Sequence, residues 1–236
     1  MPIETKALDA EIYRVGRRPD PWAFIDWAYA GTDGTFGGRW DDANGRYRVI
    51  YASSQRLGAF LETLAQFRPD PSVIAESQAI EIVEGDEETA PPGTVPLTWC
   101  REREITTGVT TEGEIDEFVV VGAAATLAIL RAAFAGRLVH FGLEDLDAAT
   151  IRRTAPRAFT QEVSSFIERQ RDEAGGRYGG IYFRSKLGDE FENWAIFEQE
   201  WIRGHSPVLS VSRGVVDPND GDLEDAMRIP GLRLGG

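Results

Sequence analysis

Gly37-Gly38-Arg39-Trp40 is followed by Tyr47-Arg48-Val49-Ile50-Tyr51 and then by a helix that carries Glu62. The paired glycines, together with Asp33-Gly34 just before them, predict a loop. The run that ends at Tyr51 is rich in β-branched and aromatic residues and predicts a strand. A loop arginine, a strand tyrosine and a helix glutamate supply a fixed cation, a flat ring and a carboxylate. Together they can bind an anionic ligand that contains a ring and can stabilise a developing positive charge.

The helix that carries Glu62 is predicted over residues 54–67, because its apolar side chains recur on one face. Glu62 lies nearly opposite that face. Its neighbours three and four positions away include Gly58, Ala59 and Ala65 and contain no lysine or arginine that could neutralise it. These small neighbours leave room for a ligand. The alternative is an ordinary solvated glutamate, and the helix taken alone favours it.

The distribution of predicted elements indicates the fold class. The chain has 236 residues, of which 42% are hydrophobic, enough for one large core or two small ones. Predicted strands and helices are interspersed without the regular rhythm of parallel α/β proteins, so we expect one α+β domain. Besides the segments above, we predict strands at 11–15 and 138–141 and within 97–105 and 179–185, and helices at 116–135 and 160–173.

The charge balance narrows the class of partner. Acidic residues outnumber basic ones 39 to 25, which gives a net charge of −14. Such a surface repels phosphate backbones and argues against direct nucleic-acid binding. A small anionic ligand stays compatible with this charge if a few arginines gather in one cleft. The excess of acid also favours solubility, which is the simpler interpretation.

Several features predict a cytoplasmic protein. Cys100 is the only cysteine, which excludes an internal disulfide and fits a reducing compartment. Residues 1–6 lack the basic and apolar regions of a signal peptide. The longest apolar run, Phe118 to Leu130, is too short for a bilayer, which needs about 20 residues. We therefore expect no membrane segment.

The sequence lacks the motifs of several common chemistries. His140 and His205 are the only histidines and, with one cysteine, give poor support to a zinc site or a Cys–His pair, so no metal is expected. His140 is expected in an apolar strand, as a core or cleft-lining residue. No G-x-S-x-G elbow occurs, although a Ser-His-Asp triad stays open. Neither G-x-G-x-x-G nor the P-loop motif occurs, which argues against Rossmann and P-loop nucleotide sites.

Two groups of short blocks resemble the RES domain. The first group is Gly37-Gly38-Arg39-Trp40-Asp41, Val49-Ile50-Tyr51-Ala52-Ser53 and Leu57-Gly58-Ala59-Phe60-Leu61-Glu62. The second is Phe159-Thr160-Gln161, Gly179-Gly180-Ile181-Tyr182-Phe183-Arg184-Ser185 and Trp194-Ala195-Ile196-Phe197-Glu198. The resemblance covers about residues 11–203, and the order and spacing of the blocks make it fairly specific. RES domains are named after Arg, Glu and Ser and are toxins of RES–Xre toxin–antitoxin pairs.

The resemblance implies a fold and a reaction. The fold is that of the ADP-ribosyltransferases of the diphtheria-toxin type, with a central split mixed or antiparallel sheet and flanking helices. The implied substrate is NAD, whose nicotinamide–ribose bond breaks through an oxocarbenium-like ribose. In this reading Glu62 stabilises the cation, Arg39 and Arg14 hold the pyrophosphate, Tyr51 stacks on or orients the nicotinamide, and Ser185 bonds the ribose or the amide.

The sequence leaves the acceptor of the ADP-ribose open. Water gives NAD glycohydrolysis, inorganic phosphate gives phosphorolysis, and a protein side chain gives ADP-ribosylation. We expect first an NAD-degrading toxin, second an ADP-ribosyltransferase that modifies a cellular protein, and third an inactive antitoxin-binding module. The resemblance also implies an Xre-type antitoxin as partner and leaves a homodimer open.

The chain departs from the RES pattern in four places. Asp41 follows Trp40 where the family usually has asparagine, and Phe183 stands where a tyrosine is common. An insertion at about 84–113 and a C-terminal tail at 212–236 lengthen the chain. We therefore place the RES-like catalytic domain at 1–211. The added segments bear on partner choice and assembly more than on the chemistry.

Overall fold

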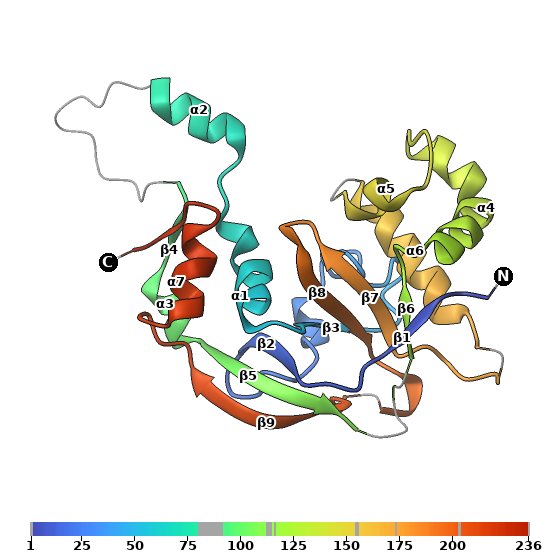
Figure 1. Ribbon diagram of the computed structural model, residues 1–236, viewed down its shortest axis with the longest axis horizontal. Coiled ribbons are helices and arrows are strands. Elements are labelled where there is room, and N and C mark those ends of the chain that lie inside the picture. The colour runs from blue at the N-terminus through green and yellow to red at the C-terminus, as the bar shows by residue number, and fades with distance from the viewer. Residues whose placement is uncertain are drawn as a thin grey trace.

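A mixed sheet of eight strands organises the computed structural model, which describes residues 2–79, 92–111, 115, 117–153, 156–172, 174–202 and 204–235. The strand order is β1-β6-β7-β8-β3-β2-β5-β9 (Figure 1). Every neighbouring pair is antiparallel except β6 and β7, which are parallel. The expected α+β class with a mixed sheet is confirmed.

The strands of this sheet are β1 (Thr5–Ala7), β2 (Ile12–Arg17), β3 (Val49–Ser53), β5 (Arg103–Thr110), β6 (Glu117–Val120), β7 (Gly180–Ser185), β8 (Gly188–Phe197) and β9 (Val208–Val215). Two short strands, β4 (Thr94–Val95) and β10 (Arg233–Leu234), pair in parallel as a separate sheet. The described α-helices are α1 (Arg56–Leu64), α2 (Pro71–Ala79), α3 (Leu97–Arg101), α4 (Ala124–His140), α5 (Ala148–Arg152), α6 (Arg157–Arg169) and α7 (Gly221–Arg228). Among the described helices, none is both long and apolar enough to cross a membrane.

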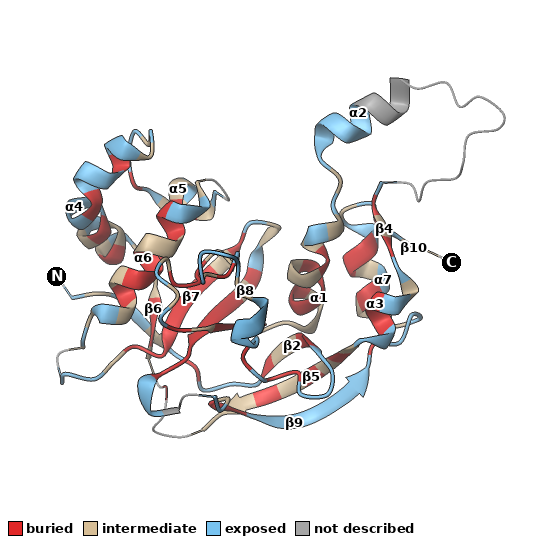
Figure 2. Cartoon of the chain, turned by 180° about the vertical axis from the view of Figure 1, so that it is seen from behind, coloured by how far each residue is buried: buried red, intermediate tan, exposed pale blue. Residues whose placement is uncertain are grey.

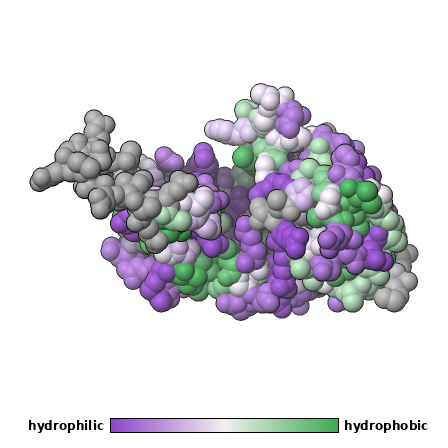
Figure 3. All heavy atoms as spheres, turned by 90° about the horizontal axis from the view of Figure 1, so that it is seen from above, coloured by the Kyte–Doolittle hydropathy of each residue, from purple (hydrophilic) through white to green (hydrophobic). Residues whose placement is uncertain are grey.

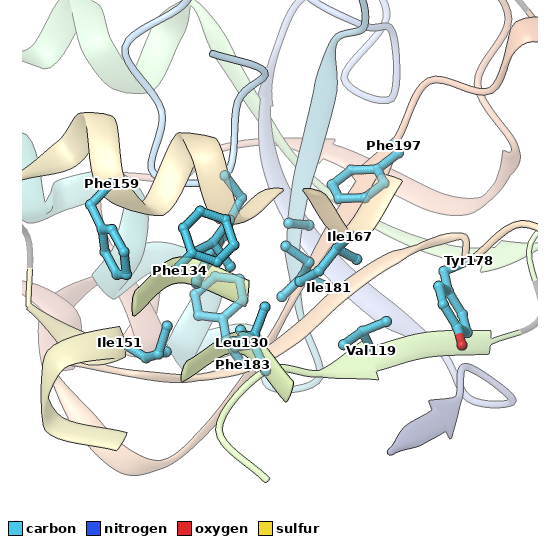
Figure 4. Close-up of a cluster of buried hydrophobic side chains, with 14 of the residues drawn as sticks. Val119, Leu130, Phe134, Ile151, Phe159, Ile167, Tyr178, Ile181, Phe183 and Phe197 are labelled. Carbon is cyan, nitrogen blue, oxygen red and sulfur yellow. The ribbon is translucent and has the colours of Figure 1, made fainter. Parts of the chain in front are cut away.

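Helices pack on the sheet in two groups (Figure 1). α4, α5 and α6 enclose a core against β6, β7 and β8, in which Phe134, Phe159 and Ile181 are buried (Figure 4). α1, α3 and α7 surround a second core, which includes Phe60 and Leu223. Figure 2 shows that buried residues line the sides on which these helices meet the strands, while the outer faces of the helices are exposed. Of these helices, α1 and the first residue of α6, Arg157, line the site described below.

The segment 116–141 differs from its prediction. Residues 117–120 form β6, which pairs with β1 and β7, and the helix that follows is α4. The predicted strand at 138–141 is instead the C-terminal end of α4, and His140 is exposed there. The predicted helix at 116–135 is confirmed from Ala124 onward, but its start and the strand at 138–141 are wrong, because the Ala-rich run after Gly122 continues the apolar pattern and hides the break between strand and helix.

The predicted strand within 97–105 starts later than expected. Residues Leu97–Arg101 form α3, and the strand β5 begins only at Arg103. Pro96 precedes the helix with a backbone φ of −66°, a value that suits the entry to a helix. Trp99 is therefore a buried helical residue.

The added segments brace the sheet and α1. Of the insertion at 84–113, residues 84–91, 112 and 113 lie outside the described residues, while β5 pairs with β2 on one side and β9 on the other. The segment 212–236 contains the end of β9 and the whole of α7. Arg56 of α1 forms ion pairs with Asp220 and, over 2.6 Å, with Asp222. The helix that carries Glu62 is thus held by residues from the far end of the chain.

Candidate functional site

A cavity of about 510 Å³ lies between α1 and the loop at Gly38. Seen from above, the surface of the molecule is hollowed near its middle (Figure 3). Four of the predicted site residues line the cavity, namely Arg14, Arg39, Tyr51 and Glu62. The first three come from β2, the loop and β3, and the last from α1. The structure therefore brings together side chains that the sequence places on four successive elements.

The cavity is basic although the chain is acidic. Among the described lining residues, Arg14, Arg39, Arg157 and Lys186 are basic and only Glu62 is acidic. The whole chain has a net charge of −14. Positive charge gathered in one hollow of an acidic protein indicates an anionic ligand.

Two donors from the sheet hold Glu62 in the cavity wall. Ser185 Oγ donates to Glu62 Oε1 over 2.5 Å, and Asn193 Nδ2 donates to the same oxygen over 2.9 Å. Ser185 and Asn193 are each 2% exposed and lie on β7 and β8, so their positions are fixed by strand pairing. Glu62 itself is half-buried. It is an oriented carboxylate, and the alternative of a fully solvated surface glutamate does not apply.

Ser185 contacts Glu62, a role that its sequence position did not predict. Its hydroxyl accepts a hydrogen bond from the backbone N–H of Leu187 over 2.9 Å and donates a hydrogen bond to Glu62 Oε1. Ser185 is absent from the cavity lining. We infer that Ser185 acts on a ligand through Glu62, while the direct bond to ribose or amide stays a prediction.

Small residues let α1 approach the sheet closely. A Cβ on Gly58 would clash with Ser53 Oγ and lie 3.2 Å from the ring of Phe191. Ala59, the next residue, lines the cavity. The small neighbours of Glu62 therefore serve two purposes, because they allow helix–strand contact on one side and leave open space on the other.

Arg39 projects from the loop beside two aromatic rings. Its guanidinium carbon lies 5.0 Å from the ring centre of Trp40 and 5.8 Å from that of Phe183. Its Nε and Nη2 atoms are buried and have no hydrogen-bond partner among the described residues. Burial lowers the pKa of Arg39 to about 10, and the nearby Glu62 opposes this shift. A buried guanidinium with unused donors favours the binding of an anion that accepts from them.

Tyr51 fixes the conformation of the loop. Its hydroxyl accepts from the backbone N–H of Trp40 and donates to Asp41 Oδ1, each over 2.9 Å. Asp41 also accepts from the N–H of Gly38, and a Cβ on Gly38 would lie 2.5 Å from the Tyr51 hydroxyl. Burial raises the pKa of both Asp41 and Tyr51. Tyr51 also lines the cavity, and an aromatic side chain there can pack against a flat ligand.

Residues of α6 hold the same loop from the other side. Gln161 Nε2 donates to the carbonyl of Gly38 over 3.1 Å, and Ser164 Oγ donates to the carbonyl of Trp40 over 2.5 Å. Arg157 Nη1 donates to a further loop carbonyl over 2.5 Å and lines the cavity. The sequence reasoning missed Arg157 as a site residue. The signal that could have found it is the adjacent block at 159–161, which belongs to the resemblance.

Arg14 joins β2 to its surroundings. Its Nε donates to the carbonyl of Pro21 and its Nη1 to the carbonyl of Tyr51, each over 2.7 Å. Burial lowers the pKa of Arg14 to about 10. Two of the N–H groups of Arg14 therefore bond to main-chain carbonyls, while its guanidinium adds positive charge to the cavity. Its direct contact with a pyrophosphate stays a prediction.

Asn193 and Lys186 also line the cavity and were missed by sequence reasoning. Burial lowers the pKa of Lys186, and Glu62 opposes the shift. Asn193 immediately precedes the block at 194–198, and a polar amide inside a buried strand is a signal that could have drawn attention to it. No cluster of His, Cys, Asp and Glu able to hold a metal ion occurs among the described residues.

Comparison with known proteins tests the resemblance to the RES domain. The sequence model of the RES domain matches residues 11–95, which include Arg39, Tyr51 and Glu62. The resemblance to the RES domain is confirmed for that part of the chain. No curated protein matches the chain. Among solved structures, the M. tuberculosis MbcT–MbcA toxin–antitoxin complex aligns with a TM-score of 0.45 and 11% identity, over 98% of this chain and 92% of that chain. These values are too low to carry an argument about function.

Proposed function

We propose that this protein is a toxin enzyme that breaks the nicotinamide–ribose bond of NAD. One observation carries the proposal: a cavity rich in arginine and lysine has one carboxylate among its described lining residues, that of Glu62, which Ser185 and Asn193 orient. The basic side chains suit a pyrophosphate, and the carboxylate suits the cation that forms on the ribose. The RES match over residues 11–95 supports the same reaction, which the resemblance implies.

The chemistry assigns a role to each side of the cavity. As the bond breaks, nicotinamide takes the bonding electron pair and leaves as a neutral ring, and the ribose becomes oxocarbenium-like. Glu62 stabilises this cation more than the ground state and so lowers the barrier. Arg39 binds the pyrophosphate, and Tyr51 packs against the nicotinamide. Addition of water at the ribose then gives ADP-ribose and releases a proton, whereas addition of phosphate gives a phosphorylated ADP-ribose.

Cavities on both sides of Arg39 support an extended ligand such as a dinucleotide. A second cavity of about 240 Å³ shares Arg39 and Phe183 with the first. Arg152 and Arg184 also line it. Two adjoining cavities that share an arginine with unused donors support an extended ligand with a central anionic group.

The proposal extends to fold, domain and partner. We take the sheet to be related to that of the diphtheria-toxin-type ADP-ribosyltransferases, and the RES-like domain to span 1–211, with 212–236 added to it. The partner we propose is an Xre-type antitoxin that covers the cavity. A neighbouring open reading frame with a helix-turn-helix pattern, whose product suppresses NAD loss when mixed with this protein, would support this partner.

Product analysis tests the proposed function. The purified protein is incubated with NAD, with and without phosphate, and the products are identified by mass. Release of nicotinamide with free ADP-ribose indicates hydrolysis, and a phosphorylated ADP-ribose indicates phosphorolysis. ADP-ribose attached to an added cellular protein would instead establish a transferase. No nicotinamide release under any of these conditions would contradict the proposal.

A further inference from the structure

Asn193 has an unused acceptor beside the carboxylate of Glu62. It lies on β8, opposite Ser53 of β3 and Phe183 of β7 in the sheet register, and lines the cavity. Its side chain is buried, with 2% of the residue exposed. Nδ2 donates to Glu62 Oε1 over 2.9 Å. Oδ1 is buried as well, but it has no hydrogen-bond partner among the described residues.

The orientation of this amide is set by Glu62. Turning the amide over would place Oδ1 against a carboxylate oxygen, and two acceptors cannot bond to each other. Nδ2 therefore faces Oε1, and Oδ1 faces another direction. A buried amide oxygen without a donor is unfavourable, so on a residue that lines a cavity it indicates a donor on the ligand.

The described donors to Glu62 share one of its two oxygens. Ser185 Oγ and Asn193 Nδ2 both bond to Oε1, and no described bond uses Oε2. Glu62 Oε2 and Asn193 Oδ1 are thus two acceptors on side chains that touch each other. A ligand with two neighbouring donors, such as a pair of adjacent hydroxyl groups, can satisfy both.

We propose that Asn193 reads the ribose of the substrate, with its Oδ1 accepting from one hydroxyl while Glu62 Oε2 accepts from the neighbouring hydroxyl. This inference rests on the proposed function, because the nicotinamide ribose of NAD carries two adjacent hydroxyls. The pair of acceptors selects a ribose over a deoxysugar, since each missing hydroxyl leaves an acceptor unpaired. Asn193 also positions Glu62 through its Nδ2 group, so it contributes to both selectivity and rate.

The test compares NAD with two analogues whose nicotinamide ribose lacks either the 2′- or the 3′-hydroxyl. For the parent protein we expect kcat/KM, taken relative to the nonenzymatic hydrolysis rate of the same compound, to fall about tenfold for each analogue, the loss of one hydrogen bond. Asn193→Ala removes one acceptor. With this variant, the analogue that lacks the hydroxyl bound by Asn193 should react as well as NAD. The analogue that lacks the hydroxyl bound by Glu62 should still show the reduced kcat/KM, because Glu62 is unchanged. Asn193→Leu, which fills the volume without polar atoms, replaces the alanine variant if that variant does not fold.

Asn193→Asp separates the two roles of the amide. It keeps an oxygen in place of Oδ1 but replaces the donor to Glu62 with a second acceptor. We expect it to retain selectivity against both analogues while its rate falls. Lowering the pH should restore part of that rate, because the two neighbouring carboxyl groups can then share a proton. A purely structural role for Asn193 would leave the selectivity ratio of the alanine and leucine variants equal to that of the parent.

Two results overturn the inference, and they are distinguishable. If the parent releases nicotinamide from NAD but the alanine and leucine variants keep the full penalty for both analogues, Asn193 does not read the ribose and the proposed function stands. If the parent releases no nicotinamide from NAD, the proposed function and this inference fail together. Thermal melting of each variant shows that the compared proteins are folded.

Discussion

Replacing Glu62 by glutamine changes one atom and removes one charge. In the parent, Oε1 accepts from Ser185 Oγ and Asn193 Nδ2. In Glu62→Gln the amide oxygen keeps both of these donors, so the amide nitrogen takes the place of Oε2. The variant therefore presents a neutral donor where the substrate meets a charged acceptor, while the contacts that hold the side chain stay in place.

The size of the effect follows from the electrostatics of the site. Glu62 is half-buried, so an effective dielectric constant of about 20 is appropriate. A unit charge about 4 Å from the developing cation then contributes about 4 kcal/mol. That energy corresponds to a rate loss of about 10³-fold, in line with the losses of about 10²–10³-fold seen when a group that stabilises transition-state charge is removed. We expect the free energy of unfolding to change by less than about 1 kcal/mol, because both bonds to Oε1 remain.

The assay measures nicotinamide release from NAD by the parent and by Glu62→Gln at equal concentration. Glu144→Gln is the matched control, because Glu144 is exposed and does not line the cavity. The control should match the parent in rate and in thermal melting. A Glu62→Gln protein that is folded and releases nicotinamide as fast as the parent would refute the assignment of Glu62 to the developing cation.

Three further predictions concern the loop and its cation. Gly38→Ala should lower the free energy of unfolding by about 1–3 kcal/mol and slow NAD cleavage, because its Cβ would meet Asp41 and Tyr51. Gly37→Ala is the control, since its Cβ would have nothing within 4 Å. This control should match the parent in thermal melting and in the rate of NAD cleavage. Burial raises the pKa of Asp41, so the folded protein binds this proton more tightly than the unfolded chain and loses stability as the pH rises from the ordinary aspartate range through the raised pKa. The Tm of Asp41→Asn relative to the parent should therefore increase from acid to neutral pH, and a constant difference would contradict the sign. Arg39→Lys keeps the charge but loses the planar fork, so steady-state kinetics should show a KM for NAD raised about tenfold with a smaller change in kcat; an unchanged KM would count against anion binding by Arg39.

The local part of the site could be predicted from the sequence. Paired glycines mark the loop at Arg39, β-branched residues mark the strand that contains Tyr51, and an apolar stripe marks the helix of Glu62. These signals depend on neighbouring residues only. Because the three elements follow one another directly, their side chains converge on one cavity.

The contacts that orient these side chains could not be predicted in the same way. Ser185 and Glu62 are 123 positions apart, and Asn193 comes from a strand paired with β3 across a similar distance in sequence. Which strands become neighbours is decided by the packing of the whole sheet, which no local pattern reports. For the same reason the sequence did not predict the hydrogen bond from Gln161 to the carbonyl of Gly38, although the block that contains Gln161 belongs to the RES resemblance.

The chain is acidic but its cavity is basic. This contrast explains why the protein can be expected both to bind a small anion and not to bind nucleic acid. At physiological ionic strength, exposed charges are screened beyond about 8 Å, so the acidic exterior has little influence on a small anion until the anion reaches the cavity. Inside, Arg39 has buried donors without partners among the described residues, and a buried charge is screened much less. A long polyanion must lie across the acidic exterior to reach the same arginine, whereas a dinucleotide only has to enter the cavity. The same charge distribution therefore disfavours nucleic acid and favours a small anion.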